Sequence, residues 1–243
     1  MFHRFFNRNT HNKTVANHSQ RIDQAQQKSD ELQQRVDALT RQRPDVDEAV
    51  TEKGLRYLSA TVAVQDSMMD HGLTALKQWL KRTNTTIVFD SSVDGFTDDA
   101  FFEKVRDKQD IAVIGFTTDG DVFGGFYSVA LTEQDKSFPD PNMFIFSIES
   151  HGRCNTPQKF VVRQREKRNA CVRAMNKSAM GFVGFWVTGK GSFTLGNASS
   201  RSACCGLSNA FEDIADTTLT GVSGFSDVGP FHHCTRVVAF QIQ

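Results

Sequence analysis

Histidine and cysteine side chains recur in the second half of the chain and are residue types that bind zinc. They are His151, Cys154, Cys204, Cys205, His232, His233 and Cys234. The pairs Cys204–Cys205 and His232–His233 lie in strand-like sequence, where neighbouring side chains point to opposite faces, so at most one of each pair fits a single site. The CxxC spacing of a zinc ribbon is missing as well. The sequence therefore predicts no metal site and no cofactor.

The thiols also offer redox chemistry, because a nearby cation lowers the pKa of a thiol and makes it reactive toward oxidants. We take Cys154, Cys204, Cys205 and Cys234 as candidate redox-sensitive residues, with Arg201 as the cation near Cys204 in the sequence. Cys171 is interpreted as a small apolar core residue. Five cysteines are an odd number and argue against a disulfide framework. Reduced thiols are therefore expected.

A basic segment runs over residues 159–177 and contains Glu166 as its one acidic residue. Its candidate contact residues for phosphate or a partner are Lys159, Arg163, Arg165, Lys167, Arg168 and Arg173. The whole chain has 28 basic and 28 acidic residues, so a charge-driven partner must use a local patch of this kind. The alternative interpretation is a solvated face without a partner.

Motifs that place catalytic groups are missing from the sequence. It contains no GxSxG, HExxH or GxxxxGK[S/T] motif, and no GxGxxG after a strand. We therefore predict that the chain is not an enzyme and has no catalytic or cofactor-binding residues. A peroxide-consuming enzyme that uses the thiol of Cys204 or Cys205 is the catalytic alternative.

Two apolar stripes with helical spacing precede these residues. The first is Val15, His18, Ile22, Ala25, Ser29, Leu32, Val36 and Leu39, which alternate three and four apart as in a heptad seam. The second is Leu55, Leu58, Val62, Met69, Leu73, Leu76 and Leu80, which predicts a helix over 45–82 after a break at Pro44. We predict a disordered segment over 1–14 and a coiled-coil stem over 15–82. The stem either forms a homo-oligomer through residues 15–80 or folds back as a hairpin.

After Arg82 the helical spacing of apolar residues gives way to short runs that are typical of strands. Asp119-Gly120 between the apolar runs 111–116 and 122–129 predicts a β-hairpin, because glycine accepts a positive φ. A strand-like run also covers 85–89, and Thr97 begins a short helix with Phe101, Phe102 and Val105 on one face. Further strands are predicted over 143–149, 159–165, 182–187, 192–195 and 237–242. So many short strands with short connections predict antiparallel β structure over 84–243.

Several of these segments resemble a known family. Residues 111–127, IAVIGFTTDGDVFGGFY, resemble the β-hairpin of the TLDc domain family of oxidation-resistance proteins. Residues 143–149, MFIFSIE, and 191–196, GSFTLG, are similar to the strands that follow in that family. The resemblance covers roughly 84–243. It implies an antiparallel β-sandwich with flanking helices. Together with the long helical coiled-coil segment that precedes it, this predicts an α+β fold.

The resemblance also implies a function. It predicts a non-catalytic protein-interaction or adaptor protein linked to the oxidative-stress response, with subunits of the vacuolar proton pump as partner. The alternative is a DNA-binding, stress-responsive transcriptional regulator that dimerises through its N-terminal helices and uses nucleic acid as partner. A secretory signal and an apolar run of about 18 residues are both missing, so no membrane span is predicted. The expected location is the cytoplasm, with the nucleus for the alternative.

Overall fold

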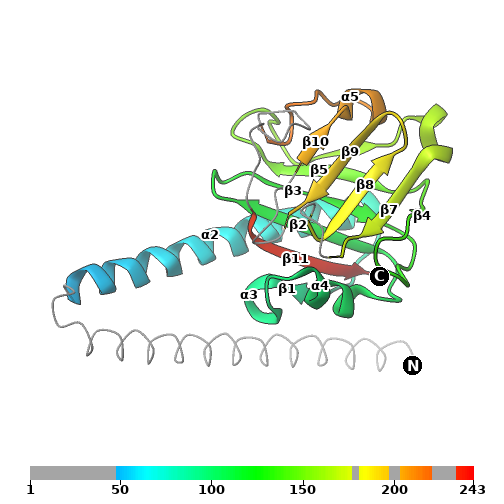
Figure 1. Ribbon diagram of the computed structural model, residues 1–243. Coiled ribbons are helices and arrows are strands. Elements are labelled where there is room, and N and C mark those ends of the chain that lie inside the picture. Colours follow the sequence, from blue (N-terminus) through cyan, green and yellow to red (C-terminus); the bar gives the residue numbers. More distant parts are fainter. Residues whose placement is uncertain (1–47, 177–180, 197–202, 221–233) are drawn as a thin grey trace, which may run out of the picture. The chain divides into compact units, whose positions relative to one another are not determined.

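Figure 1 shows the computed structural model, which describes residues 48–176, 181–196, 203–220 and 234–243. The chain divides into two compact units, Met1–Val64 and Gln65–Gln243. The segment 1–14 and the heptad seam over 15–39, both expected from the sequence, lie outside the described residues. The second unit holds the β structure and is described below.

The helix α2 (Glu48–Leu80) enters the second unit with its last turns. It ends before Lys81, whose φ of 54° lies in the left-handed region that often follows a helix. Leu76 is buried, and Met69, Leu73 and Leu80 pack against the same apolar cluster of the unit. This part of the second apolar stripe therefore packs on the globular unit itself, whereas the sequence interpretation placed the whole stripe in the stem.

Two antiparallel sheets form the body of the unit (Figure 1). The six-stranded sheet has the order β1 (Thr85–Asp90), β11 (Cys234–Ile242), β2 (Ile111–Thr117), β3 (Val122–Tyr127), β5 (Phe144–Glu149) and β6 (Gln158–Val161). The five-stranded sheet has the order β10 (Ala203–Cys205), β9 (Gly191–Leu195), β8 (Val183–Val187), β7 (Ala170–Ala174) and β4 (Phe138–Pro139). The fold is thus mixed α/β with two antiparallel sheets, which confirms the sandwich-like part of the predicted fold class.

The short helices occupy the connections between strands. They are α3 (Ser91–Asp94), α4 (Asp98–Val105), the 3-10 helix η1 (Gln164–Asn169) and α5 (Leu207–Ala210). Thr97 caps α4 as expected, because its side-chain oxygen accepts from the backbone N–H of Ala100 at 3.2 Å. Phe101 and Val105 of this helix are buried, so its predicted apolar face is confirmed.

The main core lies between the two sheets. Phe123 of β3 and Phe193 of β9 meet across it with ring centroids 5.6 Å apart. Val183, Phe185 and Val187 of β8 belong to this core. They alternate with Gly184 and Trp186, because successive residues of a strand face opposite sides of the sheet. The predicted hairpin is also confirmed, since β2 pairs with β3 and Gly120 in its turn has a φ of +84°.

A second apolar cluster covers the outer face of the six-stranded sheet, where α2 packs. Trp79 of α2 lies 6.2 Å from Phe144 and 6.1 Å from Phe146 between ring centroids. Both phenylalanines lie on the predicted strand over 143–149, and they are buried in this cluster. At Gly72 an added Cβ would collide with Cδ1 of Ile148, so the helix backbone comes close to the sheet there.

Candidate functional site

The predicted basic segment is divided among several elements instead of forming one strand and loop. Lys159 is in β6, Arg165, Lys167 and Arg168 are in η1, and Arg173 is in β7. The predicted strand over 159–165 ends at Val161, and the chain then turns into η1. The six candidate contact residues therefore do not lie on one element.

Two of the candidate cations are bound within the chain. Arg163 donates from Nε and Nη2 to the carbonyl of Ser208 at 3.1 and 2.7 Å. Arg173 donates from Nη2 to Oγ of Ser137 at 2.9 Å, and its guanidinium lies 5.4 Å from the centre of the Trp186 ring. These contacts give both arginines a structural role.

Lys159 lies apart from η1, on the six-stranded sheet. Its ammonium group is 5.4 Å from the centre of the Phe144 ring, next to the cluster under α2. Lys159 and Arg173 thus belong to different sheets. The three cations of η1 are what remains of the predicted patch.

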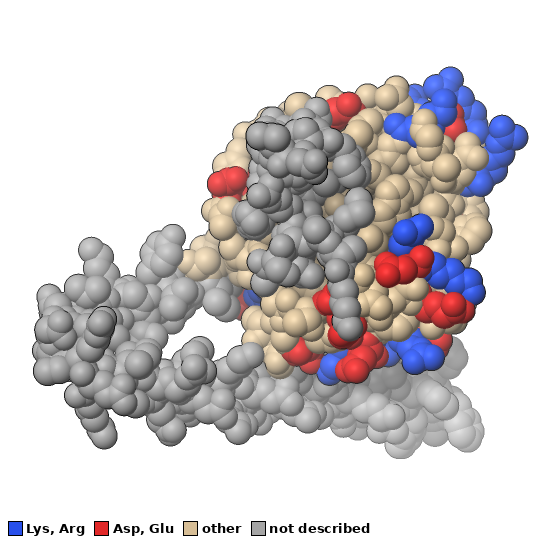
Figure 2. All heavy atoms as spheres, in the orientation of Figure 1, with Lys and Arg blue, Asp and Glu red and all other residues tan. Residues whose placement is uncertain are grey.

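We call Arg165, Lys167, Arg168 and Lys190 the basic ridge. The first three are in η1, and Lys190 is in the β8–β9 connection, which meets η1 where the N–H of Thr188 donates to the carbonyl of Asn169 at 3.0 Å. Figure 2 shows Lys and Arg side chains gathered at the upper right, over the place of the yellow-green turn that precedes β7 in Figure 1. The ridge thus has four cations against one carboxylate, Glu166.

A buried carboxylate lies under the basic ridge. Glu166 is 6% exposed and accepts from Nδ2 of Asn169 at 3.1 Å. Its Oε1 is 3.5 Å from Nε of Arg165 and 3.7 Å from Nζ of Lys190. Because the acidic side chain is below the surface, it positions these two cations without covering their outer sides.

The candidate thiols have different surroundings. Cys204 and Cys234 are buried, whereas Cys154 and Cys205 are half-buried. Burial raises the pKa of the Cys204 thiol to about 12, although a hydrogen bond with Thr220 acts in the opposite direction. This direction opposes the one that a redox-sensitive thiol needs.

Cys171 is also half-buried, which differs from the core position that the sequence suggested. It lies on the same face of the five-stranded sheet as Trp186, Ser192 and Cys205, because these four residues pair across β7, β8, β9 and β10. Arg201, His232 and His233 lie outside the described residues. Within the described ranges, no group of three or more His, Cys, Asp and Glu side chains converges as metal ligands would.

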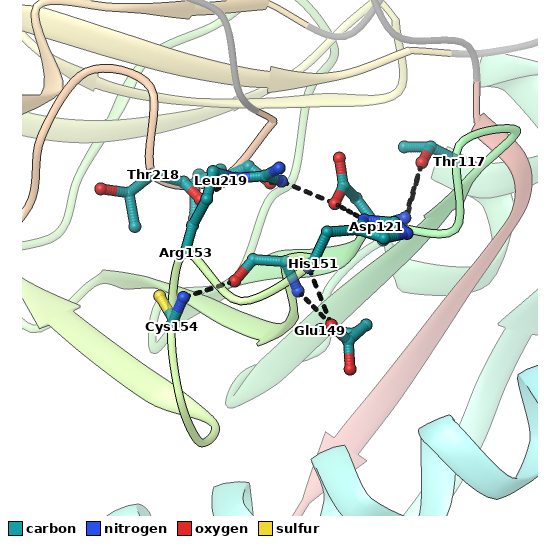
Figure 3. Close-up of polar contacts among 9 residues, drawn as sticks. Thr117, Asp121, Glu149, His151, Arg153, Cys154, Thr218 and Leu219 are labelled. Atoms are coloured by element: carbon teal, nitrogen blue, oxygen red, sulfur yellow. Dashed lines mark hydrogen bonds and ion pairs between the residues drawn. The ribbon is translucent and has the colours of Figure 1, made fainter.

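A polar network around Asp121 was not predicted from the sequence. Asp121 is 2% exposed, and its Oδ1 accepts from Nη2 of Arg153 at 2.6 Å and lies 2.9 Å from Nδ1 of His151. Figure 3 shows the Arg153 side chain between Asp121 and the backbone of Thr218 and Leu219. Arg153 donates to both of these carbonyls at 3.0 Å.

The turn that carries His151 is shaped by the same network. His151 and Gly152 have φ values of 50° and 81°, and the N–H of Arg153 donates to the carbonyl of Ser150 at 3.1 Å. These are the features of a type I′ turn, which is costly for a residue with a Cβ. Oε1 of Glu149 accepts from the N–H groups of Ser150 and His151 and holds the turn. The network therefore ties the β2–β3 hairpin, the β5–β6 loop and the segment after α5 together.

A second buried ion pair joins α2, β1 and β11. Arg236 of β11 donates from Nη2 to Asp90 at 2.7 Å and from Nη1 to Asp66 of α2 at 2.8 Å. Burial works against the charge of Asp90, but the hydrogen bond and the charge of Arg236, with hydrogen bonds from Ser92, outweigh it. The pKa of Asp90 therefore lies below its ordinary value.

Comparison with known proteins adds a family match. The family model described as the TLDc domain matches residues 62–214, which begin inside α2 and end after α5. No match was found among curated proteins. In the described part of the chain, no helix is long and apolar enough to span a membrane.

Proposed function

Since the chain belongs to the TLDc domain family, which is linked to the oxidative-stress response, we propose that it is a non-catalytic adaptor that acts by binding other proteins. The partner that the family resemblance suggests is the vacuolar proton pump, through one or more of its subunits. We place the protein in the cytoplasm, with access to the nucleus. Its segment before Gln65 pairs with a second copy of the chain.

The network around Asp121 is the observation that carries this proposal. Its charged groups form contacts within the fold, because Asp121 accepts from Arg153 and Arg153 donates to the carbonyls of Thr218 and Leu219. A buried carboxylate that is paired in this way fixes the relative positions of loops. This is what a rigid recognition domain needs, because a preformed surface loses less entropy on binding.

The position of α2 limits which residues are left for the oligomeric part of the proposal. Leu76 and its neighbours in residues 65–80 already pack on the six-stranded sheet. Pairing between copies would therefore use the heptad seam over 15–39 and the apolar residues Leu55, Leu58 and Val62, which precede the globular unit.

The test is affinity capture from cell lysate with the tagged full chain, with and without nuclease. We expect nuclease-resistant recovery of proton-pump subunits, quantified by mass spectrometry against the tag alone. Recovery of chromatin proteins that nuclease abolishes would favour the DNA-binding regulator instead.

Catalysis is tested in parallel with the purified full chain. We expect it to consume hydrogen peroxide no faster than a Cys204→Ser, Cys205→Ser variant does. Turnover that this double substitution removes would contradict the non-catalytic proposal and favour the peroxide-consuming alternative.

A further inference from the structure

We propose that the basic ridge of Arg165, Lys167, Arg168 and Lys190 is a docking surface for an acidic segment of a protein partner. This inference rests on the proposed adaptor function and names the surface that performs it. The argument depends on how the ridge is held, on which of its charges face solvent and on what kind of anion fits it.

The backbone under the ridge is held at both ends. At its start, the N–H of Arg163 donates to the carbonyl of Ala210 at 3.0 Å, while the Arg163 guanidinium binds the carbonyl of Ser208. At its end, Asn169 accepts from Thr188 of the β8–β9 connection at 3.0 Å. The ridge is therefore fixed to α5 and to the five-stranded sheet, and its cations do not have to be ordered from a flexible loop on binding.

Three of the four ridge cations are exposed to solvent, and Lys167 is half-buried. The Arg165 side chain is 76% exposed, that of Lys190 is 44% exposed, and Arg168 is exposed as well. Glu166 is buried between them and neutralises one positive charge from below. The outer surface thus keeps a net positive charge, although the whole chain has equal numbers of basic and acidic residues.

The small number of cations in the ridge favours an acidic peptide segment over a nucleic acid duplex. Duplex-binding proteins commonly contact about six to ten phosphates. Here the other basic residues of the segment are occupied elsewhere, since Arg163 and Arg173 are bound within the chain and Lys159 lies on the other sheet. The ridge holds two arginines and two lysines, and a guanidinium donates two parallel hydrogen bonds to the carboxylate of an Asp or Glu side chain.

The test compares matched variants of the full chain. The ridge variant carries Arg165→Gln, Lys167→Gln and Arg168→Gln. The control variant carries Arg82→Gln, Lys104→Gln and Arg106→Gln, which removes the same residue types from exposed positions with side chains 48%, 49% and 59% exposed. Thermal melts of both variants check that neither change unfolds the protein.

Binding is measured by fluorescence anisotropy with two probes, a labelled synthetic peptide of Glu, Asp and Gly and a labelled DNA duplex. We expect the wild type and the control variant to bind the peptide more weakly as salt rises. The ridge variant should bind it about tenfold more weakly than the wild type, as expected for the loss of several ion pairs. The duplex should bind more weakly than the peptide.

Three outcomes would overturn the proposal. They are equal peptide binding by the ridge variant and the wild type, no peptide binding by the wild type, and tighter binding of the duplex through the same residues. Lysate capture with the ridge variant separates this proposal from the adaptor function. If the wild type and the ridge variant recover the same partners equally, the adaptor stands and the ridge proposal fails; if the wild type recovers none, the adaptor itself fails.

Discussion

Asp121 and Asp90 are each 2% exposed, and each is bound by an arginine that also reaches a second part of the chain. Arg153 connects Asp121 to the segment after α5, and Arg236 connects Asp90 to α2. A buried ion pair of this kind is costly to break, because removing one partner leaves the other charge desolvated. At the scale of single residues, these two carboxylates are therefore where substitutions should have the largest effect on stability.

We predict that Asp121→Ala lowers the free energy of unfolding by about 2–3 kcal/mol, because Arg153 loses its buried counter-charge. Urea denaturation followed by circular dichroism measures this change. Glu133→Ala, which removes a surface pair with Lys136, serves as the comparison and should change stability by less than about 0.5 kcal/mol. Equal effects of the two substitutions would show that the network does not stabilise the fold.

The lowered pKa of Asp90 predicts how the stability of the fold depends on pH. Its pKa in the folded protein lies below the ordinary value of 3.8, so the unfolded chain takes up its proton first as the pH falls. The stabilisation by the Asp90–Arg236 pair is complete above pH 3.8 and is lost as the pH falls through the folded pKa. Urea denaturation between neutral pH and the acid range should show a steeper loss for the wild type than for Asp90→Asn. Parallel curves would contradict the assignment.

At the scale of elements, the hairpin and the α4 cap could be predicted because their signals are local. Asp119-Gly120 and Thr97 act on residues close to them in the chain. Strands β4 and β7 were missed, since β4 has two residues and β7 carries Cys171 and Arg173 on its outer face. The Asp121 network could not be predicted either, because Arg153 and Leu219 are 66 positions apart and only the fold brings them together.

Helix α2 shows why an apolar stripe does not identify its partner. The spacing from Met69 to Leu80 suits another helix as well as a sheet face, and burial alone stabilises both arrangements. Gly72 lies within this stripe, where the helix backbone meets Ile148 and Ile114. A glycine within an apolar stripe thus lies at a close approach of the helix to the sheet.

We predict that Gly72→Leu weakens the docking of α2 and lowers the free energy of unfolding by about 2 kcal/mol, because the new side chain overpacks the contact with the sheet. Gln78→Leu, on the exposed face of the same helix, is the matched control and should have little effect. The emission of Trp79, which packs against Phe144 and Phe146, should shift to the red in the Gly72 variant only. An unshifted spectrum with wild-type stability would show that the helix backbone is not in close contact with the sheet.

At the scale of the whole molecule, the boundary of the globular unit lies within α2. The compact unit begins at Gln65 and the family match at residue 62. The change from helical spacing to short strand-like runs had suggested a start at residue 84. The difference arises because residues 65–80 have the apolar spacing of a helix but form one side of the apolar cluster on the six-stranded sheet. The local sequence pattern indicates secondary structure, whereas the boundary of a unit depends on which surfaces are buried together.

The two boundaries predict different behaviour of truncated chains. A chain of residues 65–243 keeps Leu76, Trp79 and the Asp66–Arg236 pair, so we expect a soluble protein with a cooperative melt. A chain of residues 84–243 uncovers the apolar face that includes Phe146 and Ile114, and an exposed patch of that kind promotes aggregation. Light scattering and binding of a hydrophobic dye distinguish them. Equal solubility and equal melting temperature would show that α2 contributes nothing to the unit and that the boundary lies after the helix.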